Sequence, residues 1–465
     1  SSWAATINAA SCSQADVQSA INSAATGNTV VVPAGNCTWT TYVSIPSSKK
    51  IVLLGAGMDS TVITVAVADT VIDMTTSGSR VTGFGFVGGG MILVDGDGWR
   101  IDHCKFYNTS FALSIHARGT RVGLHPTGLV DNNSFHNGRV TVVLAAMLAE
   151  GNDQHVVWAK PLNLGSADNT VFVEDNEFTF NVFANAIDEN YGGGYVFRYN
   201  TIVNSGIGGN QGAYIEAHSV QGNNRASRKW EIYGNILNNT GGSIYFPFRI
   251  RGGTGTIFYN SVIGTWTNDG IGFDNVRSYA AKGDGGLCDG DSLWDGNEDA
   301  TGYPCRDQIG RGGDATLWTH LPIEAPGAYT QFLAPTYEWL NREEGNIELG
   351  VNVINNSSNH IKPNRDYYSY NASFNGTTGV GAGTLAARPA TCTTGVGYWA
   401  TNQSTSDLTG MVGANPATPL SGTFYKCTAP NTWTASYTPY TYPHPLRENL
   451  LKGDVNLDGS VNVLD

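Results

Sequence analysis

Hydrophobic residues are spaced in two different ways along this chain. Between Ser13 and Ala25 apolar residues such as Val17 lie on one helical face, and Gly27 follows where a helix would end. From Thr29 onward, apolar residues fall in short runs separated by Gly and Asn, which is typical of strands joined by tight turns. The pattern therefore predicts an N-terminal helix followed by many short β-strands.

One six-residue pattern recurs through the strand-rich region. It reads apolar, two variable residues, Asn, one variable residue, apolar, as in Val130, Asn133 and Phe135. The shorter intervals between copies match the roughly 20–30 residues of a solenoid coil, and the longer ones indicate inserted loops. An Asn at the same turn of each coil can hydrogen-bond its neighbours. The anchors are Asn133, Asn176, Asn200, Asn235 and Asn260, with Phe84 and Cys104 at the same place in two earlier copies.

This repeat resembles the right-handed parallel β-helix of the pectate-lyase-like superfamily, over roughly residues 29–375. The resemblance implies an all-β solenoid, with the N-terminal helix as its cap, and a carbohydrate as substrate. After residue 276 the repeat fades, and residues 306–345 are interpreted as part of a long insertion. We expect a cap at 1–28, a β-helix at 29–380 with an insertion at about 277–345, a small disulfide-closed β module at 381–447 and a partial calcium loop at 448–465.

The seven cysteines are spread thinly and include no C-x-x-C pair. Local pairing favours three disulfides, although the sequence cannot fix connectivity: Cys12 with Cys37, Cys288 with Cys305, and Cys392 with Cys427. Cys104 is then left over and is expected in the core. Disulfides indicate an oxidising compartment, so we expect a secreted protein.

Charge is scarce in this chain. The 26 Lys and Arg and 39 Asp and Glu give a formal net charge of −13, and only 14% of residues are charged. The acidic balance without a basic stripe argues against nucleic acid as a partner. The apolar run from Val140 to Ala149 is too short to span a membrane. We expect a monomer. Because charge is scarce, any cluster of charged residues is informative.

Such a cluster is predicted on the strands that precede three of the anchors. Strands in successive coils stack about 4.8 Å apart, so residues one coil apart in sequence become neighbours. The register of each strand is uncertain by a residue or two. The candidate catalytic residues are Asp188, Glu189, Glu216, His218, Arg249 and Arg251.

Two chemistries fit this cluster. In β-elimination on a uronic-acid polymer, Arg249 or Arg251 would neutralise the substrate carboxylate. His218, or nearby Tyr214 or Lys229, would act as the base.

In glycoside hydrolysis, two of Asp188, Glu189 and Glu216 would act as acid and base. The Arg pair and a basic cluster at residues 225–229 favour elimination on an anionic glycan. A non-catalytic glycan-binding or adhesive β-helix is the alternative from another class. Candidate substrate-binding residues are Tyr191, Tyr214, Arg225, Lys229, Trp230, Trp266 and Asp274.

The end of the chain carries a calcium-loop pattern. Oxygen-bearing side chains alternate, Gly459 allows the sharp turn, and a carboxylate stands at the twelfth position. The pattern resembles the first loop of a dockerin module, which implies Ca²⁺ and a cohesin-type scaffold as partner. A further Ca²⁺ in the β-helix is also an expectation. The candidate ligands are Asp454, Asn456, Asp458, Ser460 and Asp465.

Overall fold

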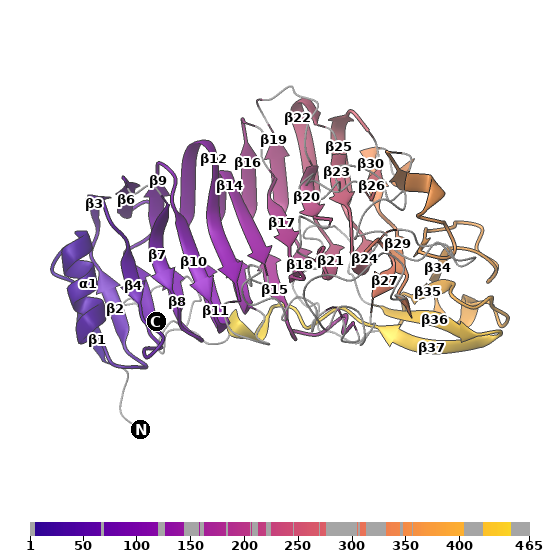
Figure 1. Ribbon diagram of the computed structural model, residues 1–465, viewed down its shortest axis with the longest axis horizontal. Coiled ribbons are helices and arrows are strands. Elements are labelled where there is room, and N and C mark those ends of the chain that lie inside the picture. Colours follow the sequence, from indigo (N-terminus) through magenta and orange to yellow (C-terminus); the bar gives the residue numbers. More distant parts are fainter. Residues whose placement is uncertain are drawn as a thin grey trace.

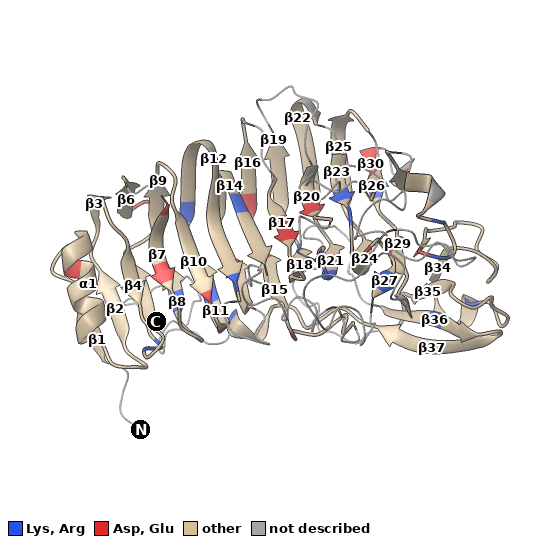
Figure 2. Ribbon diagram, viewed as in Figure 1, with Lys and Arg blue, Asp and Glu red and all other residues tan. Residues whose placement is uncertain are grey.

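The protein is a parallel β-helix in which most coils contribute one strand to each of three parallel ladders (Figure 1). The computed structural model describes residues 5–66, 69–119, 126–143, 158, 162–182, 185–204, 206, 213–219, 225–244, 246–268, 270–275, 305, 307–312, 332–344, 347–355, 357–403 and 422–447. The all-β solenoid predicted from the repeat is confirmed. Charged residues are sparse along its strands (Figure 2).

The first ladder runs the length of the solenoid. Its strands, in order, are β1 (Thr6–Asn8), β2 (Thr29–Val32), β5 (Val52–Gly55), β8 (Arg80–Thr82), β11 (Asp97–Asp102), β13 (Thr127–Asp131), β15 (Val171–Glu174), β18 (Gly194–Arg198), β21 (Lys229–Tyr233), β24 (Thr254–Phe258), β29 (Thr336–Trp339) and β33 (Tyr367–Tyr368).

The other two ladders are joined through the long strands β12 (Lys105–Arg118) and β14 (Ser134–Val143), whose first halves belong to the second ladder and last halves to the third. The second ladder also contains β3 (Gly35–Trp39), β6 (Thr61–Val65), β9 (Gly85–Val87), β16 (Glu177–Phe180), β19 (Thr201–Asn204), β22 (Ile236–Ile244), β25 (Ser261–Trp266) and β30 (Arg342–Glu343). The third contains β4 (Val43–Ile45), β7 (Thr70–Met74), β10 (Met91–Asp95), β17 (Ile187–Asn190), β20 (Ala213–Ala217), β23 (Phe246–Ile250), β26 (Ile271–Phe273) and β32 (Val351–Val353).

Short elements lie outside the ladders. They are the antiparallel pair β27 (Arg311–Gly312) and β28 (Phe332–Leu333), the strand β31 (Ile347–Glu348), and 3₁₀ turns at Ser357–Asn359, Leu385–Ala387 and Pro445–Arg447.

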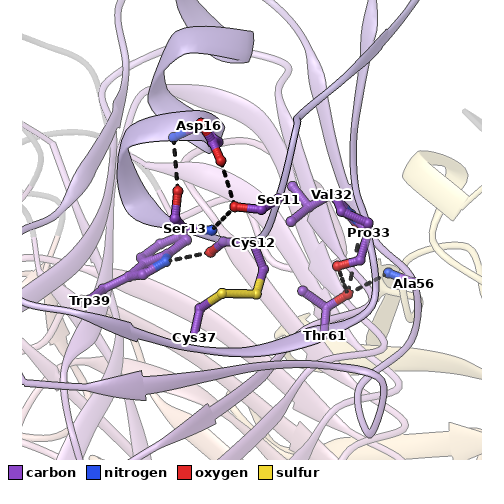
Figure 3. Close-up of a disulfide and its surroundings, with 10 residues drawn as sticks. All are labelled: Ser11, Cys12, Ser13, Asp16, Val32, Pro33, Cys37, Trp39, Ala56 and Thr61. Atoms are coloured by element: carbon purple, nitrogen blue, oxygen red, sulfur yellow. Dashed lines mark hydrogen bonds between the residues drawn. A yellow bond between two sulfur atoms is a disulfide. The ribbon is translucent and has the colours of Figure 1, made fainter.

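The helix α1 (Gln14–Ser23) caps the N-terminal end, as predicted. The side chain of Ser13 accepts a hydrogen bond from the backbone of Asp16 at 3.3 Å, which satisfies one of the free donors of the first turn. The predicted Cys12–Cys37 disulfide joins the segment before α1 to β3 (Figure 3). In the described part of the chain no helix is long and apolar enough to cross a membrane.

The predicted asparagine ladder is present at the turn between the first and second ladders of strands. Each side-chain amide donates to the side-chain oxygen of the Asn on the next coil, at distances of 3.0, 3.0, 3.2, 2.9 and 2.9 Å. Cys104 extends the series, because its backbone N–H donates to Asn133 at 2.9 Å. It is free and buried, as predicted. The members are Asn133, Asn176, Asn200, Asn235, Asn260 and Asn341.

The last of these, Asn341, corrects the expected insertion. Strands β29 and β30 and the ladder residue Asn341 form a regular coil within the residues assigned to a loop. The repeat was missed there because Glu338 and Glu343 stand where its apolar residues usually are. Glu338 is buried, which raises its pKa to about 7, and its carboxyl accepts from Asn341.

A small mixed sheet follows the solenoid, built from β34 (Val380–Gly383), β35 (Gly397–Ala400), β36 (Thr423–Ala429) and β37 (Thr432–Tyr437). Strands β35 and β36 pair antiparallel, and the predicted Cys392–Cys427 disulfide closes the module. Trp399 packs on Trp339 of the first ladder at 5.2 Å between ring centroids. Cys305 is disulfide-bonded, and its predicted partner Cys288 lies outside the described residues.

Residues 438–447, which we call the C-terminal strap, run back along the outside of the first ladder (Figure 1). Arg198 donates to the carbonyls of Tyr440 and Thr441 at 2.7 and 2.9 Å. Arg447 lies 2.9 Å from Glu174 and 3.3 Å from Asp131. The strap therefore ties the C-terminal module to coils near the middle of the solenoid.

Candidate active site

The third ladder arranges the predicted charged residues in rows. Side chains alternate along a strand, and Ile187, Ile215 and Phe248 point into the core. Ile187 pairs with Ile215, and Glu216 pairs with Arg249, so Asp188, Glu216 and Arg249 follow one another on the outer face of successive coils. Figure 2 shows this change from acidic β17 and β20 to basic β23.

A second outer row lies two residues further along each strand. Continuing the same register, this row contains Asn190, His218 and Arg251. The two rows bring Asp188, Glu216, His218, Arg249 and Arg251 together, and we call these five residues the central cluster. They were among the residues predicted to form one site.

Asp188 and His218 form the closest pair of the central cluster. Nδ1 of His218 lies 2.5 Å from a carboxylate oxygen of Asp188, and the two side chains are 15% and 5% exposed. Burial acts to raise the pKa of Asp188, but the charges of His218, Arg139 and Arg251 and the hydrogen bond to His218 outweigh it and lower this pKa. Asp188 is therefore an ionised partner that orients the ring. The ring makes no other hydrogen bond to the described residues, which leaves Nε2 to act on a ligand.

Glu216 is held by hydrogen bonds at both of its carboxyl oxygens. One of its oxygens accepts a hydrogen bond and ion pair from Arg251, and the other accepts from the side-chain amide of Asn185 at 3.0 Å. Glu216 therefore positions Arg251.

Two partly exposed arginines flank the Asp188–His218 pair. Arg249 donates to Asp274 at 3.0 Å, and Asn355 donates to the same carboxylate at 3.2 Å. Arg139 donates to Asn185 at 3.1 Å and to Asp188 at 3.3 Å. About a fifth of each arginine side chain is exposed, 21% and 22% respectively. Arg249 can offer its remaining donors to an anion while staying anchored.

Arg139 and Asn185 were not predicted from the sequence. Arg139 directly precedes Val140 of the inner row, so alternation along β14 places it on the same face as Asp188, and this offset was the available signal. Asn185 lies two residues before Ile187, outside the strand, and only its hydrogen bonds to Arg139 and Glu216 place it beside the cluster.

Glu189 is a correction to the predicted site. It pairs in register with Val142 of the inner row and is completely buried, so it points into the solenoid and away from Asp188's face. Burial raises its pKa well above the ordinary value, although backbone N–H groups of Lys229 and Arg228 oppose this. One carboxyl oxygen accepts from Arg228 and the other has no hydrogen-bond partner among the described residues. Burial therefore favours the protonated form of Glu189 inside the coil.

Three of the aromatic residues predicted to bind substrate are in the core. Tyr214 packs between Phe180 and Trp266, each at 5.4 Å between ring centroids. Trp230 is fully buried and donates to the carbonyl of Gly252 at 3.1 Å. Tyr214, Trp230 and Trp266 thus pack the solenoid, and Tyr214 is not available as a base.

The predicted basic cluster also lies elsewhere. Arg225 is fully buried in an ion pair with Asp307 at 2.5 Å. Lys229 belongs to the first ladder, and its ammonium donates to Asn163 at 2.7 Å and Thr170 at 2.9 Å. Neither residue joins the central cluster.

The two remaining candidates lie at the edges of the cluster. Asp274 is the buried partner of Arg249. Tyr191 follows β17 with a positive φ of 56° and is partly exposed, so its predicted contact with substrate stays a prediction.

Asp188, Glu216 and His218 can each offer one ligand atom to a metal ion, and these atoms lie within 4.8 Å of one another. Ca²⁺ prefers six to eight oxygen ligands, so an imidazole and two carboxylates suit it poorly. Arg139 and Arg251 already neutralise the carboxylates. The candidate calcium ligands Asp454, Asn456, Asp458, Ser460 and Asp465 lie outside the described residues.

No family model matches this chain, and no curated protein matches it. Among solved structures, the chain is similar to an alginate lyase from Paenibacillus sp. str. FPU-7. The two share 14% sequence identity with a TM-score of 0.44, and the match covers 75% of this chain and 97% of that one. A likeness at this level carries no conclusion about the activity of this chain.

Proposed function

We propose that this protein is a secreted polysaccharide lyase that cleaves a uronate-containing glycan by β-elimination. The observation that supports this most is the Asp188–His218 pair at 2.5 Å between two partly exposed arginines. It combines an oriented base with groups that bind a carboxylate.

The reaction needs a base at the carbon that bears the carboxylate. The base removes the proton from this carbon, a double bond forms to the neighbouring ring carbon, and the glycosidic oxygen leaves with the bonding electrons and takes up a proton. In the proposal, Nε2 of His218 is the base. Asp188 accepts a hydrogen bond from Nδ1–H of His218. This bond fixes the tautomer of the ring and stabilises the imidazolium that forms.

The arginines supply the electrostatic part of the mechanism. Removing this proton spreads negative charge over the substrate carboxylate, so donors aimed at it stabilise the transition state. Arg249 and Arg139 present planar guanidinium groups that match a carboxylate. Their anchors, Asp274 and Asn185, limit the reorganisation needed on binding.

Glycoside hydrolysis is less well supported, because it requires one carboxyl that is protonated at working pH. The pKa of Asp188 is lowered, and both oxygens of Glu216 accept hydrogen bonds. The carboxyl with a strongly raised pKa, Glu189, faces the core.

Secretion is part of the same proposal. The Cys12–Cys37 and Cys392–Cys427 disulfides support an oxidising compartment, where a polymer-degrading enzyme would meet its substrate.

The test is incubation with a panel of neutral and uronic-acid polysaccharides that includes polygalacturonate, alginate and glucuronan. Ultraviolet absorbance of unsaturated ends and the release of reducing ends are read together. Both signals are expected on at least one polyuronate, and both are expected to vanish in His218→Ala.

The matched control is His136→Ala, which removes a histidine stacked on Tyr107 at the neighbouring ladder. It should keep full activity. Reducing ends without absorbance would mean that the protein is a glycoside hydrolase and not a lyase. The absence of both signals on every polymer would reject the enzyme and favour a glycan-binding protein.

A further inference from the structure

One row of side chains on the outer face of the first ladder runs from the middle of the solenoid toward the N-terminal end. Its members alternate with core residues along each strand and pair in register from coil to coil. In order they are Phe172, Leu129, Arg100, Arg80 and Val52. This row belongs to a different ladder from the central cluster.

The C-terminal strap covers the first part of this row. The ring of His444 lies 4.6 Å from the ring of Phe172, measured between centroids. Three residues further along the strap, the carbonyl of Arg447 accepts from Arg100 at 3.4 Å, two coils nearer the N-terminal end. The strap therefore follows the row toward the N-terminal end (Figure 1).

Beyond the strap, the same row lines an open groove with a volume of about 640 Å³. Leu446 of the strap lines one end of this groove. The groove then crosses Arg100, Arg80 and Val52 and reaches Asn28, just before β2. It is thus the uncovered continuation of the surface along which the strap runs.

The lining of the groove indicates what kind of occupant fits. Leu446, Ile51 and Val52 contribute apolar surface, and Val52 is partly exposed. Lys50 is exposed, and its ammonium has no hydrogen-bond or ion-pair partner among the described residues. Apolar surface beside a free cation suits a peptide that carries large apolar side chains and a carboxylate.

The residues that follow the strap have this composition. Residues 448–465 lie outside the described residues, and the first of them include Glu448, Leu450 and Leu451, followed by Asp454. The six residues 448–453 can span roughly 20 Å when extended. The groove crosses three coil steps from β11 to β2, about 14 Å. The segment is therefore long enough to fill it.

We propose that residues 448–453 of the same chain occupy this groove, with their leucines against Val52 and a carboxylate of Glu448 or Asp454 at Lys50. The strap then extends across the first ladder to the end capped by α1. Residues 454–465, which carry the predicted calcium loop, begin at that end. A partner bound through this loop is held away from the central cluster, which lies on the third ladder.

The first test is limited digestion with trypsin, which cleaves after Lys452. EDTA is present, so that a bound Ca²⁺ does not protect this bond. Mass spectrometry follows the release of residues 453–465. Cleavage should be slow in the parent protein and at least about tenfold faster in Lys50→Glu and in Val52→Glu, because each places a negative charge in the groove.

Matched controls come from the second ladder. Lys105→Glu reverses the charge of another exposed lysine, and Val203→Glu changes another partly exposed valine on an outer face. Both should keep the cleavage rate of the parent protein. Thermal unfolding confirms that the variants are folded, and Lys50→Glu alone decides the test if Val52→Glu is not.

The second test is cross-linking with a carbodiimide, which joins an ammonium to a carboxylate in contact with it. Equal amounts of ¹⁵N-labelled and unlabelled protein are mixed, and the peptides that contain Lys50 are mapped. Bonds from Lys50 to Glu448 or Asp454 of the same chain are expected. Bonds between labelled and unlabelled chains would assign the groove to a second copy and overturn the proposal.

Two further results would also overturn it. One is rapid cleavage in the parent protein, or a rate that both folded groove variants leave unchanged. The other is a cross-link map in which Lys50 is not joined to any of residues 448–465. None of these outcomes depends on whether the protein is a lyase.

Discussion

At the scale of single residues, the proposed function depends on how Asp188 holds His218. The carboxylate fixes which ring nitrogen carries the proton, and its lowered pKa keeps it ionised. In Asp188→Asn the amide can donate to Nδ1 and so favour the wrong tautomer. We predict a fall in kcat of about 10²–10⁴-fold with little change in KM, measured on the polymer that the panel identifies. Thr179→Val is the folded control, and an unchanged kcat would remove Asp188 from the mechanism.

Glu189 gives a prediction about pH and stability. Its folded-state pKa lies well above its unfolded value, so folding favours the protonated form. A raised pKa contributes stability that is present below the unfolded value of about 4.3 and is lost as pH rises toward the folded value.

Glu189→Gln keeps the shape and the acceptor for Arg228 but cannot ionise. We predict that it melts several degrees higher than the parent protein at pH 8, and that the difference shrinks to nearly nothing at pH 4. Differential scanning calorimetry at the two pH values measures this. A difference that grows at low pH would contradict a buried neutral acid.

Asp188 and Glu189 show what the sequence could and could not predict about the site. The positions of Asp188, Glu216 and His218 on neighbouring coils followed from the repeat. The inward direction of Glu189 was accessible in principle, because apolar Ile187 marks the inner row two residues earlier. Arg225 and Lys229 could not be excluded from sequence, since their partners Asp307 and Asn163 come from distant segments.

At the scale of elements, the asparagine ladder holds successive turns together. The buried amide of Asn200 donates to the carbonyl of Val173 at 2.9 Å and to Asn235 at 3.2 Å, and its oxygen accepts from the backbone of Asn176 at 3.0 Å. Asn200→Ala leaves these groups without partners at about 1–3 kcal/mol each.

We therefore predict that Asn200→Ala lowers the free energy of unfolding by at least about 3 kcal/mol, measured by urea denaturation. The control is Asn22→Ala on the exposed face of α1, which should change stability by less than about 0.5 kcal/mol. A small effect at Asn200 would mean that strand stacking alone fixes the turns.

Elements were predicted well where the repeat kept its apolar positions and poorly where it did not. The coil at β29 and β30 was missed because buried Glu338 replaces an apolar residue and is satisfied by Asn341 instead. The hydrogen bond, which only the stacked structure reveals, compensates for a substitution that breaks the pattern.

At the scale of the whole molecule, the scarcity of charge has a structural meaning. Several of the charged residues are buried in ion pairs on the ladders, as Arg198 is with Glu174 at 2.5 Å. On the third ladder these pairs form the central cluster. On the first ladder they receive the C-terminal strap, which the proline-rich sequence did not predict.

The strap yields the last prediction. Arg447 ion-pairs with Asp131 and Glu174, whose side chains are completely buried, and removing the guanidinium leaves these carboxylates with less compensation. Breaking a buried pair typically costs about 3–5 kcal/mol, so Arg447→Ala should lower the free energy of unfolding by about this amount. Arg447→Lys keeps the charge but loses the forked geometry and should fall in between. Because the central cluster lies on another ladder, kcat at a temperature well below melting should stay unchanged. Loss of activity without loss of stability would mean that the strap acts on the site and not on the fold.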